Sequence, residues 1–389
     1  MNTSINEDWE HGGFGIYIHW PFCAAKCPYC DFNSHVSRHI DEKLWLEAYQ
    51  KEISRIHQLT KSRRVKSIFF GGGTPSLMSP DLVSDILSHI RSLWLINNDC
   101  EVTLEANPTS VEAQKFLNFK SAGINRVSMG IQSLNDQDLK RLGRQHSAKE
   151  ALEAFTTARN IYERVSFDLI YARQEQSISQ WKSELQQALN RDIDHLSLYQ
   201  LTIEEGTAFG DRYAVGKLTG LPNENRASDL FEITQELCEQ NGMKAYEVSN
   251  HARAGSECQH NILYWKYGDY AGIGPGAHGR LTLENNRYST EGYSQPSKWL
   301  SAVSEGCGDK LTQKLSLYDQ SQEFVLMGMR LTEGICKKRY QNFFGYSAKF
   351  SAIQSLEYEG LIKTTSEKIS TTPRGRMVLN YVIRELLMD

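Results

Sequence analysis

The chain has 389 residues, of which 40% are hydrophobic and 23% are charged, a balance typical of a globular protein with an extensive core and about two or three domains. Its net charge of −4 disfavours any general attraction to nucleic acid or to anionic lipid. No stretch approaches the roughly 20 apolar residues that span a bilayer, and the acidic, polar first residues are predicted to be neither a signal peptide nor a transit peptide.

Up to about residue 245, the chain alternates between short apolar runs and longer amphipathic stretches. The apolar runs predict strands at residues 15–20, 65–70, 101–106, 126–131, 165–171 and 195–203. Apolar residues at helical spacing predict helices at residues 42–58, 79–94, 111–123, 151–162, 177–192 and 227–242. This alternation indicates an α/β fold with parallel strands joined by right-handed crossovers. Six βα units are too few for a closed eight-stranded barrel, and sites in such folds form at the C-terminal ends of the strands.

The pattern changes from about Asn250. Residues 251–280 are rich in Gly, aromatic residues and His without a clear period, which predicts loop and short strand. From about residue 315 a helix, a strand pair and a final helix predict a small winged-helix-like α+β domain. Its mixed charges favour a lid or packing role over DNA binding. We therefore predict a core at residues 8–248, a connecting region at 249–312 and a C-terminal domain at 313–389.

Three closely spaced cysteines, Cys23, Cys27 and Cys30, directly follow the first predicted strand. Three thiolates give an iron–sulfur cluster three ligands and leave one iron open, whereas electron-carrier clusters and structural zinc usually take four ligands. The alternative is three unrelated buried thiols. The other five cysteines are scattered and do not indicate a disulfide framework, which fits a reducing cytoplasm.

The residues around these cysteines narrow the interpretation. The runs YIHWPFC, at Tyr17 to Cys23, and CPYCDF, at Cys27 to Phe32, resemble the radical S-adenosylmethionine (SAM) superfamily. Within it they are similar to the branch that contains oxygen-independent coproporphyrinogen oxidase and the HemW-type haem chaperones. The resemblance implies an open (β/α)6 partial TIM barrel. It also implies a [4Fe-4S] cluster whose open iron binds the amino and carboxylate groups of SAM.

Polar or glycine residues follow the later predicted strands and would meet on one rim. A Gly-rich loop with Thr74 follows the second strand, and it lacks the GK[ST] sequence of a Walker phosphate loop. Taken singly, the polar residues are more often solvated than ligands. The resemblance implies that the SAM-site candidates are Tyr17, Tyr29, Gly72, Gly73, Thr74, Glu105, Gln132, Arg144 and Asp168. After Asp168 the family commonly has a Gly/Pro turn, whereas here Ala172 to Gln176 read ARQEQ.

A second motif lies in the connecting region. The run HNILYW resembles the HNxxYW signature of HemW-type proteins, and the resemblance implies that His260, Tyr264 and Trp265 contribute to a haem site. Histidine is a common axial ligand of haem iron, and aromatic rings can pack on a porphyrin face. The alternative is an aromatic loop that packs around a structural histidine. His278 is a lesser candidate for haem, and His19 for a contact with SAM or the cluster.

Two departures separate this chain from the oxidase. Phe32 stands where the oxidase has a fourth cysteine, and the cluster motif is reached within about two dozen residues, too soon for the oxidase's N-terminal extension. We therefore expect a cytoplasmic haem chaperone that passes haem to acceptors such as respiratory enzymes, with at most a peripheral membrane contact and no nucleic-acid partner. The alternatives are coproporphyrinogen III oxidase activity and a radical SAM enzyme that modifies tRNA.

Overall fold

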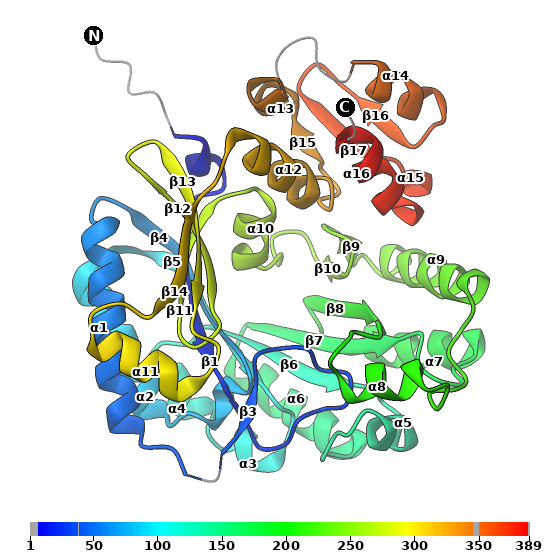
Figure 1. Cartoon of the computed structure of the whole chain (residues 1–389). Coiled ribbons are helices and arrows are strands. Elements are labelled where there is room, and N and C mark those ends of the chain that lie inside the picture. The colour runs from blue at the N-terminus through cyan, green and yellow to red at the C-terminus, as the bar shows by residue number, and fades with distance from the viewer. Residues whose placement is uncertain (1–6, 38, 345–349, 388–389) are drawn as a thin grey trace.

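The structure is a computed structural model that describes residues 7–37, 39–344 and 350–387. Among these residues a twelve-stranded sheet forms the centre of the molecule. Most helices of the N-terminal two thirds lie along the outer side of this curved sheet, and the C-terminal elements, orange to red, lie above it (Figure 1). The arrangement leaves the inner side of the sheet facing the connecting region.

Six neighbouring parallel strands make up the middle of the sheet. They are β1 (Phe14–Trp20), β4 (Arg64–Gly72), β5 (Leu95–Ala106), β6 (Arg126–Gln132), β7 (Arg164–Tyr171) and β8 (His195–Gln200). Their order follows the chain, as repeated right-handed βα units require. The predicted (β/α)6 partial barrel is confirmed. The strand ends carry the loops from which the site is built.

The segments before and between the strands contain helices, the longer of which each bury an apolar face. They are α1 (Glu42–Leu59), α2 (Pro80–Leu93), α3 (Ser110–Ala113), α4 (Phe116–Ala122), α5 (Asp136–Arg141), α6 (Ala148–Ile161), α7 (Ile178–Leu189), α8 (Ala208–Ala214) and α9 (Glu224–Gln240), with one-turn 3-10 helices at Asp8–His11 and Pro75–Leu77. In α1, Trp45, Tyr49, Ile53 and Ile56 recur at helical spacing and are buried. Ser147 and Ser177 begin α6 and α7 with capping boxes.

Both sides of the parallel sheet are extended by further strands, some of them in residues 251–280, where the sequence predicted loop and short strand. On one side stand β11 (Asp269–Ile273), parallel to β1, and then β12 (His278–Leu283), β13 (Asn286–Gly292) and β14 (Asp309–Lys314), with α11 (Pro296–Ser304) between the last two. On the other side β10 (Asn250–Ala252) and β9 (Lys244–Ala245) continue antiparallel from β8. These pairings cover edges of the partial barrel that would otherwise be open.

The expectation of loop for the HNILYW run is wrong, because these residues form helix α10 (Gln259–Trp265). The helix has only seven residues, too few to be stable by propensity alone. Contacts with β4, β1, β11 and α12 surround it. Its structure therefore comes from tertiary packing that a sequence period cannot report.

The C-terminal elements enclose a core of their own around Phe324, Val325, Ile369 and Val382. They are α12 (Leu317–Gly328), β15 (Ile335–Cys336), α13 (Lys337–Phe344), α14 (Phe350–Tyr358), β16 (Ile362–Thr364), β17 (Lys368–Thr371), α15 (Pro373–Met377) and α16 (Leu379–Leu387). Helices around a small antiparallel sheet give the predicted winged-helix-like arrangement. Residues 345–349 and 388–389 of the predicted domain lie outside the described residues. No helix within the described ranges is long and apolar enough to cross a membrane.

Candidate functional site

A cavity of about 1340 Å³ lies where the parallel strands end and the connecting region crosses them. It is lined by three cysteines and by nearly every other residue that the sequence singled out. These are Tyr17, Cys23, Cys27, Tyr29, Cys30, Gly72, Gly73, Thr74, Glu105, Gln132, Arg144, Asp168, His260 and Tyr264, together with His19 and His278. The structure therefore gathers the candidates for cluster, SAM and haem in one space, while their roles as ligands stay predictions.

The cysteines lie in the loop that follows β1, which contains the short pair β2 (Phe22–Cys23) and β3 (His35–Val36). Thr74 Oγ1 donates to Cys23 Sγ at 3.4 Å, and Arg144 Nη1 donates to Cys27 Sγ at 3.5 Å. Burial raises the pKa of the Cys23 and Cys30 thiols. Two donors are thus already directed at sulfur atoms, an arrangement that suits thiolates bound to a metal.

The donor set fits an iron–sulfur cluster better than a single ion. Among the described residues, no three His, Cys, Asp or Glu side chains converge closely enough to hold one metal ion. In a [4Fe-4S] cluster each cysteine binds a different iron, so the thiols must be spread over the width of the cluster. Three half-buried thiols that line one cavity without converging on a single point meet that requirement.

The Gly-rich loop after β4 lies against the cluster loop. A Cβ at Gly73 would stand 2.6 Å from the Phe22 carbonyl oxygen, and a Cβ at Gly72 would stand 2.6 Å from the His19 ring. Gly72 also has a φ of 107°, which favours glycine. The Gly72 amide donates to Glu105 Oε2 at 3.2 Å. Glycine is required here so that the loop can approach the cysteines and aim an amide at the carboxylate.

Two carboxyl groups, Glu105 at the end of β5 and Asp168 in β7, face the cavity. Burial, with the nearby charge of Asp168, raises the pKa of Glu105 to about 8. Burial also raises the pKa of Asp168 to about 6, opposed by hydrogen bonds from serines such as Ser128, whose Oγ lies 3.1 Å from Oδ2. A cationic ligand would stabilise the ionised form of both groups, as the ammonium and sulfonium of SAM would.

Arg144 and Gln132 line the same cavity, Gln132 from β6, the strand between those that carry Glu105 and Asp168. Arg144 Nη2 donates to Asn107 Oδ1 at 2.6 Å and to the Gly130 carbonyl at 2.9 Å, so the guanidinium is held in place, and no carboxylate of the described residues forms an ion pair with it. Gln132 adopts a φ of 69° at the end of β6, and its side-chain oxygen is buried with no recorded hydrogen bond among the described residues. An oriented guanidinium and an open amide are groups that bind a polar ligand such as the carboxylate of SAM.

His260 lies at the beginning of α10, deep in the cavity. Its Nδ1 is 2.9 Å from Ser67 Oγ, and its ring stacks on Phe69, with centroids 5.1 Å apart, and on Tyr17 at 6.3 Å. Burial, with the charge of Arg126, lowers the pKa of His260 to about 4. The imidazole is therefore neutral at physiological pH and can offer a nitrogen lone pair to a metal.

The two aromatic residues of the motif differ in position. Tyr264 lines the cavity and packs on Tyr270, with centroids 5.2 Å apart. Trp265 does not line the cavity, and the Arg330 guanidinium lies 4.8 Å from its ring centroid. The structure thus directs Trp265 toward the C-terminal domain, and of the three predicted haem residues His260 and Tyr264 line the cavity.

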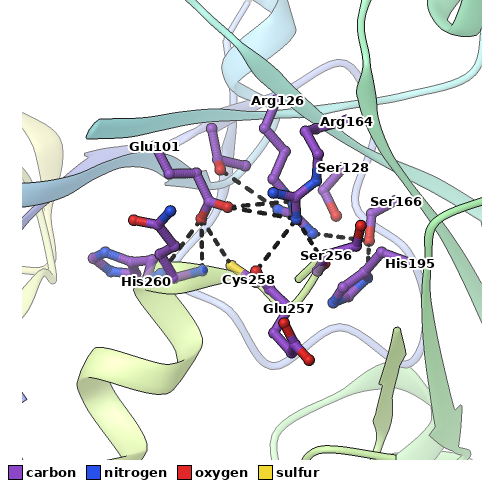
Figure 2. A network of polar contacts seen from close by, with 12 residues as sticks. Glu101, Arg126, Ser128, Arg164, Ser166, His195, Ser256, Glu257, Cys258 and His260 are labelled. Atoms are coloured by element: carbon purple, nitrogen blue, oxygen red, sulfur yellow. Dashed lines mark hydrogen bonds and ion pairs between the residues drawn. The ribbon is translucent and has the colours of Figure 1, made fainter. Parts of the chain in front are cut away.

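Several buried polar residues beside the site were missed from the sequence. Glu101 and Arg126 lie within the runs EVTLEA and RVSMGI, and both are buried beside the beginning of α10 in a network with Arg164 (Figure 2). A charged residue inside an apolar strand run was the signal that could have found them. Ser67, which contacts His260, gives no such signal, because serine is unremarkable in a strand.

Comparison with known proteins agrees with this geometry. The radical SAM superfamily model matches residues 17–186, and the HemN C-terminal domain model matches residues 315–378. The heme chaperone HemW of Haemophilus influenzae is 36% identical, over 96% of this chain and 98% of its own, and HemW of Escherichia coli is 34% identical with the same coverage. The mitochondrial radical S-adenosyl methionine domain-containing protein 1 of Bos taurus is 36% identical over 96% of this chain and 87% of its own.

A solved structure supports the fold. The coproporphyrinogen III oxidase HemN from Escherichia coli, described as a radical SAM enzyme, superposes with a TM-score of 0.81 at 20% identity, covering 96% of this chain and 90% of its own. At this identity the likeness concerns the fold alone. The near full-length identity to the HemW proteins is more specific, and with the matched domains it shows that the chain belongs to the radical SAM superfamily and, within it, to the HemW family.

Proposed function

We propose that this protein binds haem beside a [4Fe-4S] cluster and SAM, and that it transfers the haem to acceptor proteins. The observation that carries the proposal is the position of His260, a neutral imidazole that lines the same cavity as the three cysteines. The relatives named heme chaperone, at 32–36% identity over nearly the whole chain, support the same function.

In this proposal the cysteines Cys23, Cys27 and Cys30 hold the cluster, which supplies an open iron for SAM and an electron. Glu105 and Asp168 accept hydrogen bonds from the cationic and hydroxyl groups of SAM, and Arg144 pairs with its carboxylate. Thr74 and Arg144 stabilise the thiolates through their bonds to sulfur. These residues bind and orient; the chain needs no further acid or base for that task.

Haem is the cargo in this proposal, and His260 supplies its axial nitrogen. The ring is held from one side by Ser67, and Tyr264 offers an apolar face within the same cavity. A single protein ligand suits a chaperone, since haem must also leave. We place the function in the cytoplasm, where the eight cysteines, none of them in a disulfide, would stay reduced.

Absorbance titration of the reconstituted protein with haemin tests haem binding. We expect a Soret shift in the wild type and a much weaker one in His260→Ala. The matched control is His89→Ala, because His89 is half-buried and hydrogen-bonded to Ser54 but does not line this cavity. Equal haem affinity in wild type and His260→Ala would contradict the proposed site.

Transfer is tested separately. Loaded protein is mixed with the haem-free form of a b-type haem protein, and the appearance of the acceptor's spectrum is followed against free haemin at the same concentration. We expect transfer that is faster than spontaneous dissociation into buffer. A rate equal to spontaneous dissociation would reduce the proposal to haem storage.

The competing function, oxidation of coproporphyrinogen III, is tested with the same preparation supplied with reductant and SAM. We expect no protoporphyrinogen, because Phe32, an exposed residue at the cavity, stands where the oxidase has a cysteine. Formation of protoporphyrinogen in this assay would establish the oxidase function in its place.

A further inference from the structure

Glu101 is a buried carboxylate directly beneath the beginning of α10, and it is only 4% exposed. Its Oε1 accepts three hydrogen bonds from consecutive residues: from Cys258 Sγ at 3.3 Å, from the Gln259 amide at 2.9 Å and from the His260 amide at 3.4 Å. Figure 2 shows these contacts converging on one oxygen. The backbone of His260 is therefore attached to strand β5 through a single side chain.

Two arginines balance the charge of Glu101 from the other side. Arg126 Nε lies 3.9 Å and Arg164 Nη2 lies 3.8 Å from Glu101 Oε2, so both contacts are ion pairs rather than hydrogen bonds. Arg164 Nη2 also donates to the carbonyls of Ser256 and Glu257, at 2.6 and 3.2 Å. The segment that leads into α10 is thus held by the same charged group that faces Glu101.

Arg126 in turn is held by hydroxyl groups of the neighbouring strands. Its Nη2 donates to Ser166 Oγ at 3.0 Å and its Nη1 to Thr103 Oγ1 at 3.4 Å. Glu101 and Arg126 are both buried, so removal of the Glu101 charge would leave the Arg126 guanidinium without this ion pair, which is costly. A network of this kind holds one arrangement of the residues it joins.

The side chains that follow Cys258 are held as well. Ser67 contacts His260 Nδ1, and Asn261 Nδ2 donates to Tyr246 Oη at 3.4 Å. Tyr246 Oη lies 2.8 Å from His195 Nε2. Cys258 is the residue before the helix, and its side chain makes no capping hydrogen bond to α10. Glu101 therefore replaces a local cap with a contact from the barrel.

We propose that Glu101 is a positioning residue that sets the place of the His260 imidazole in the cavity, by accepting from the Cys258 thiol and the two following amides while paired with Arg126 and Arg164. The proposal rests on the proposed haem role of His260. Glu101 does not line the cavity and touches no cofactor space itself. It acts through α10, because a seven-residue helix takes its position from the contacts around it.

The test compares Glu101→Gln with Glu52→Gln. Glu52 is a matched control, because it is also buried, pairs with Arg55 at 2.6 Å and accepts from the Gly308 amide at 3.2 Å, far from the cavity. Haemin titration and the electron paramagnetic resonance spectrum of the ferric haem are recorded for both. We expect Glu101→Gln to weaken haem binding about tenfold and to broaden the high-spin signal of the ferric haem, with cluster content and SAM affinity unchanged.

A milder pair keeps the test decisive if Glu101→Gln fails to fold. Cys258→Ala removes one donor to Glu101, whereas Cys258→Ser keeps a donor at that position. We expect a broadened haem spectrum in Cys258→Ala and recovery in Cys258→Ser.

The outcomes separate the two proposals. If His260→Ala binds haem like the wild type, the haem site itself is wrong. If His260→Ala loses haem but Glu101→Gln and Cys258→Ala keep the wild-type spectrum and affinity, the role of Glu101 is overturned. An equal change in Glu52→Gln would also overturn it, since the effect would then be general destabilisation.

Discussion

At the scale of single residues, ligand binding depends on carboxyl groups of the cavity whose protonation state a cationic ligand would change. Glu105 has a pKa of about 8 because it is buried beside Asp168, although the Gly72 amide and Arg126 oppose the shift. Near neutral pH much of this carboxyl is protonated. A cationic ligand that needs the carboxylate must displace that proton, so binding is linked to pH.

We predict that SAM affinity of the reconstituted protein rises between about pH 6 and 8 and that binding releases protons. Calorimetry in two buffers of different ionisation enthalpy measures the release. In Glu105→Gln the affinity should be lower and its pH dependence flatter, because the titrating group is gone while the shape is kept. The comparison matters because the amino group of SAM titrates too. An identical pH profile in both proteins would contradict the assignment of Glu105.

The same shift makes a prediction for the protein without SAM. The folded pKa of Glu105 lies above the usual value of 4.5, so its contribution to stability is present at low pH and is lost as pH rises through about 8. Urea denaturation of the cluster-free protein measures its free energy of unfolding at pH 6 and at pH 8. This free energy should fall less between the two pH values in Glu105→Gln than in wild type. A loss of the same size in both would show that other groups dominate.

For the cysteines, we predict that the triple variant Cys23→Ala/Cys27→Ala/Cys30→Ala loses its iron and sulfide after anaerobic reconstitution. Three thiolates are the only sulfur ligands among the residues lining the cavity. The control is Cys307→Ala, an exposed cysteine elsewhere, which should keep a full cluster. Iron and sulfide analysis with Mössbauer spectra makes the measurement. A triple variant with a full cluster would refute the site.

At the scale of elements, the strands and helices of the barrel were predictable because each buries a periodic apolar face. The extensions of the sheet were predicted only as short strands without positions or partners, since β11 and β10 are short and contain Gly, Asn or His, and they are strands because β1 and β8 offer them edges. Helix α10 is a similar case. For the site, the sequence motifs predicted most of the residues that face the cavity. Ser67 and Tyr246 contact the residues of α10 only in the folded chain, so no sequence spacing predicts their role.

The loop after β7, which reads ARQEQ at Ala172 to Gln176, contains no glycine, yet it adopts a conformation that glycine favours. Glu175 is exposed with a φ of 58°, and its amide donates to the Gly220 carbonyl at 2.7 Å. The left-handed region costs a non-glycine residue about 1–2 kcal/mol, of which glycine's greater chain entropy offsets part.

We therefore predict that Glu175→Gly raises the free energy of unfolding by about 0.5–1 kcal/mol, measured by urea denaturation. As a control, Glu153→Gly within α6 should lower it by about 1 kcal/mol, because glycine weakens a helix interior. A lower free energy of unfolding in Glu175→Gly would mean that a contact of the Glu175 side chain stabilises the fold by more than the backbone strain destabilises it.

At the scale of the whole molecule, the cavity has a barrel on one side and α10 on the other, and α10 is in turn covered by the C-terminal domain. Arg339 of α13 joins these parts. Its guanidinium pairs with Asp8 at 2.7 Å, donates to the Lys266 carbonyl at the end of α10 at 3.0 Å, and lies 4.7 Å from the Phe324 ring centroid. The C-terminal domain thereby holds the helix that carries His260.

We predict that Arg339→Met lowers the stability of this region by about 1–2 kcal/mol, since it removes a partly buried ion pair and a bond to a carbonyl. Hydrogen exchange should quicken in α10, α12 and α13 and stay unchanged in β4 to β7, which form the barrel's own core. Arg384→Met is the control, because Arg384 is exposed, pairs with its neighbour Glu385 and lies over the Tyr381 ring of its own helix, at 5.2 Å from the ring centroid. Unchanged exchange in α10 of Arg339→Met would show that the barrel alone holds this helix, through Glu101 and Ser67, and that the C-terminal domain does not influence the haem side of the cavity.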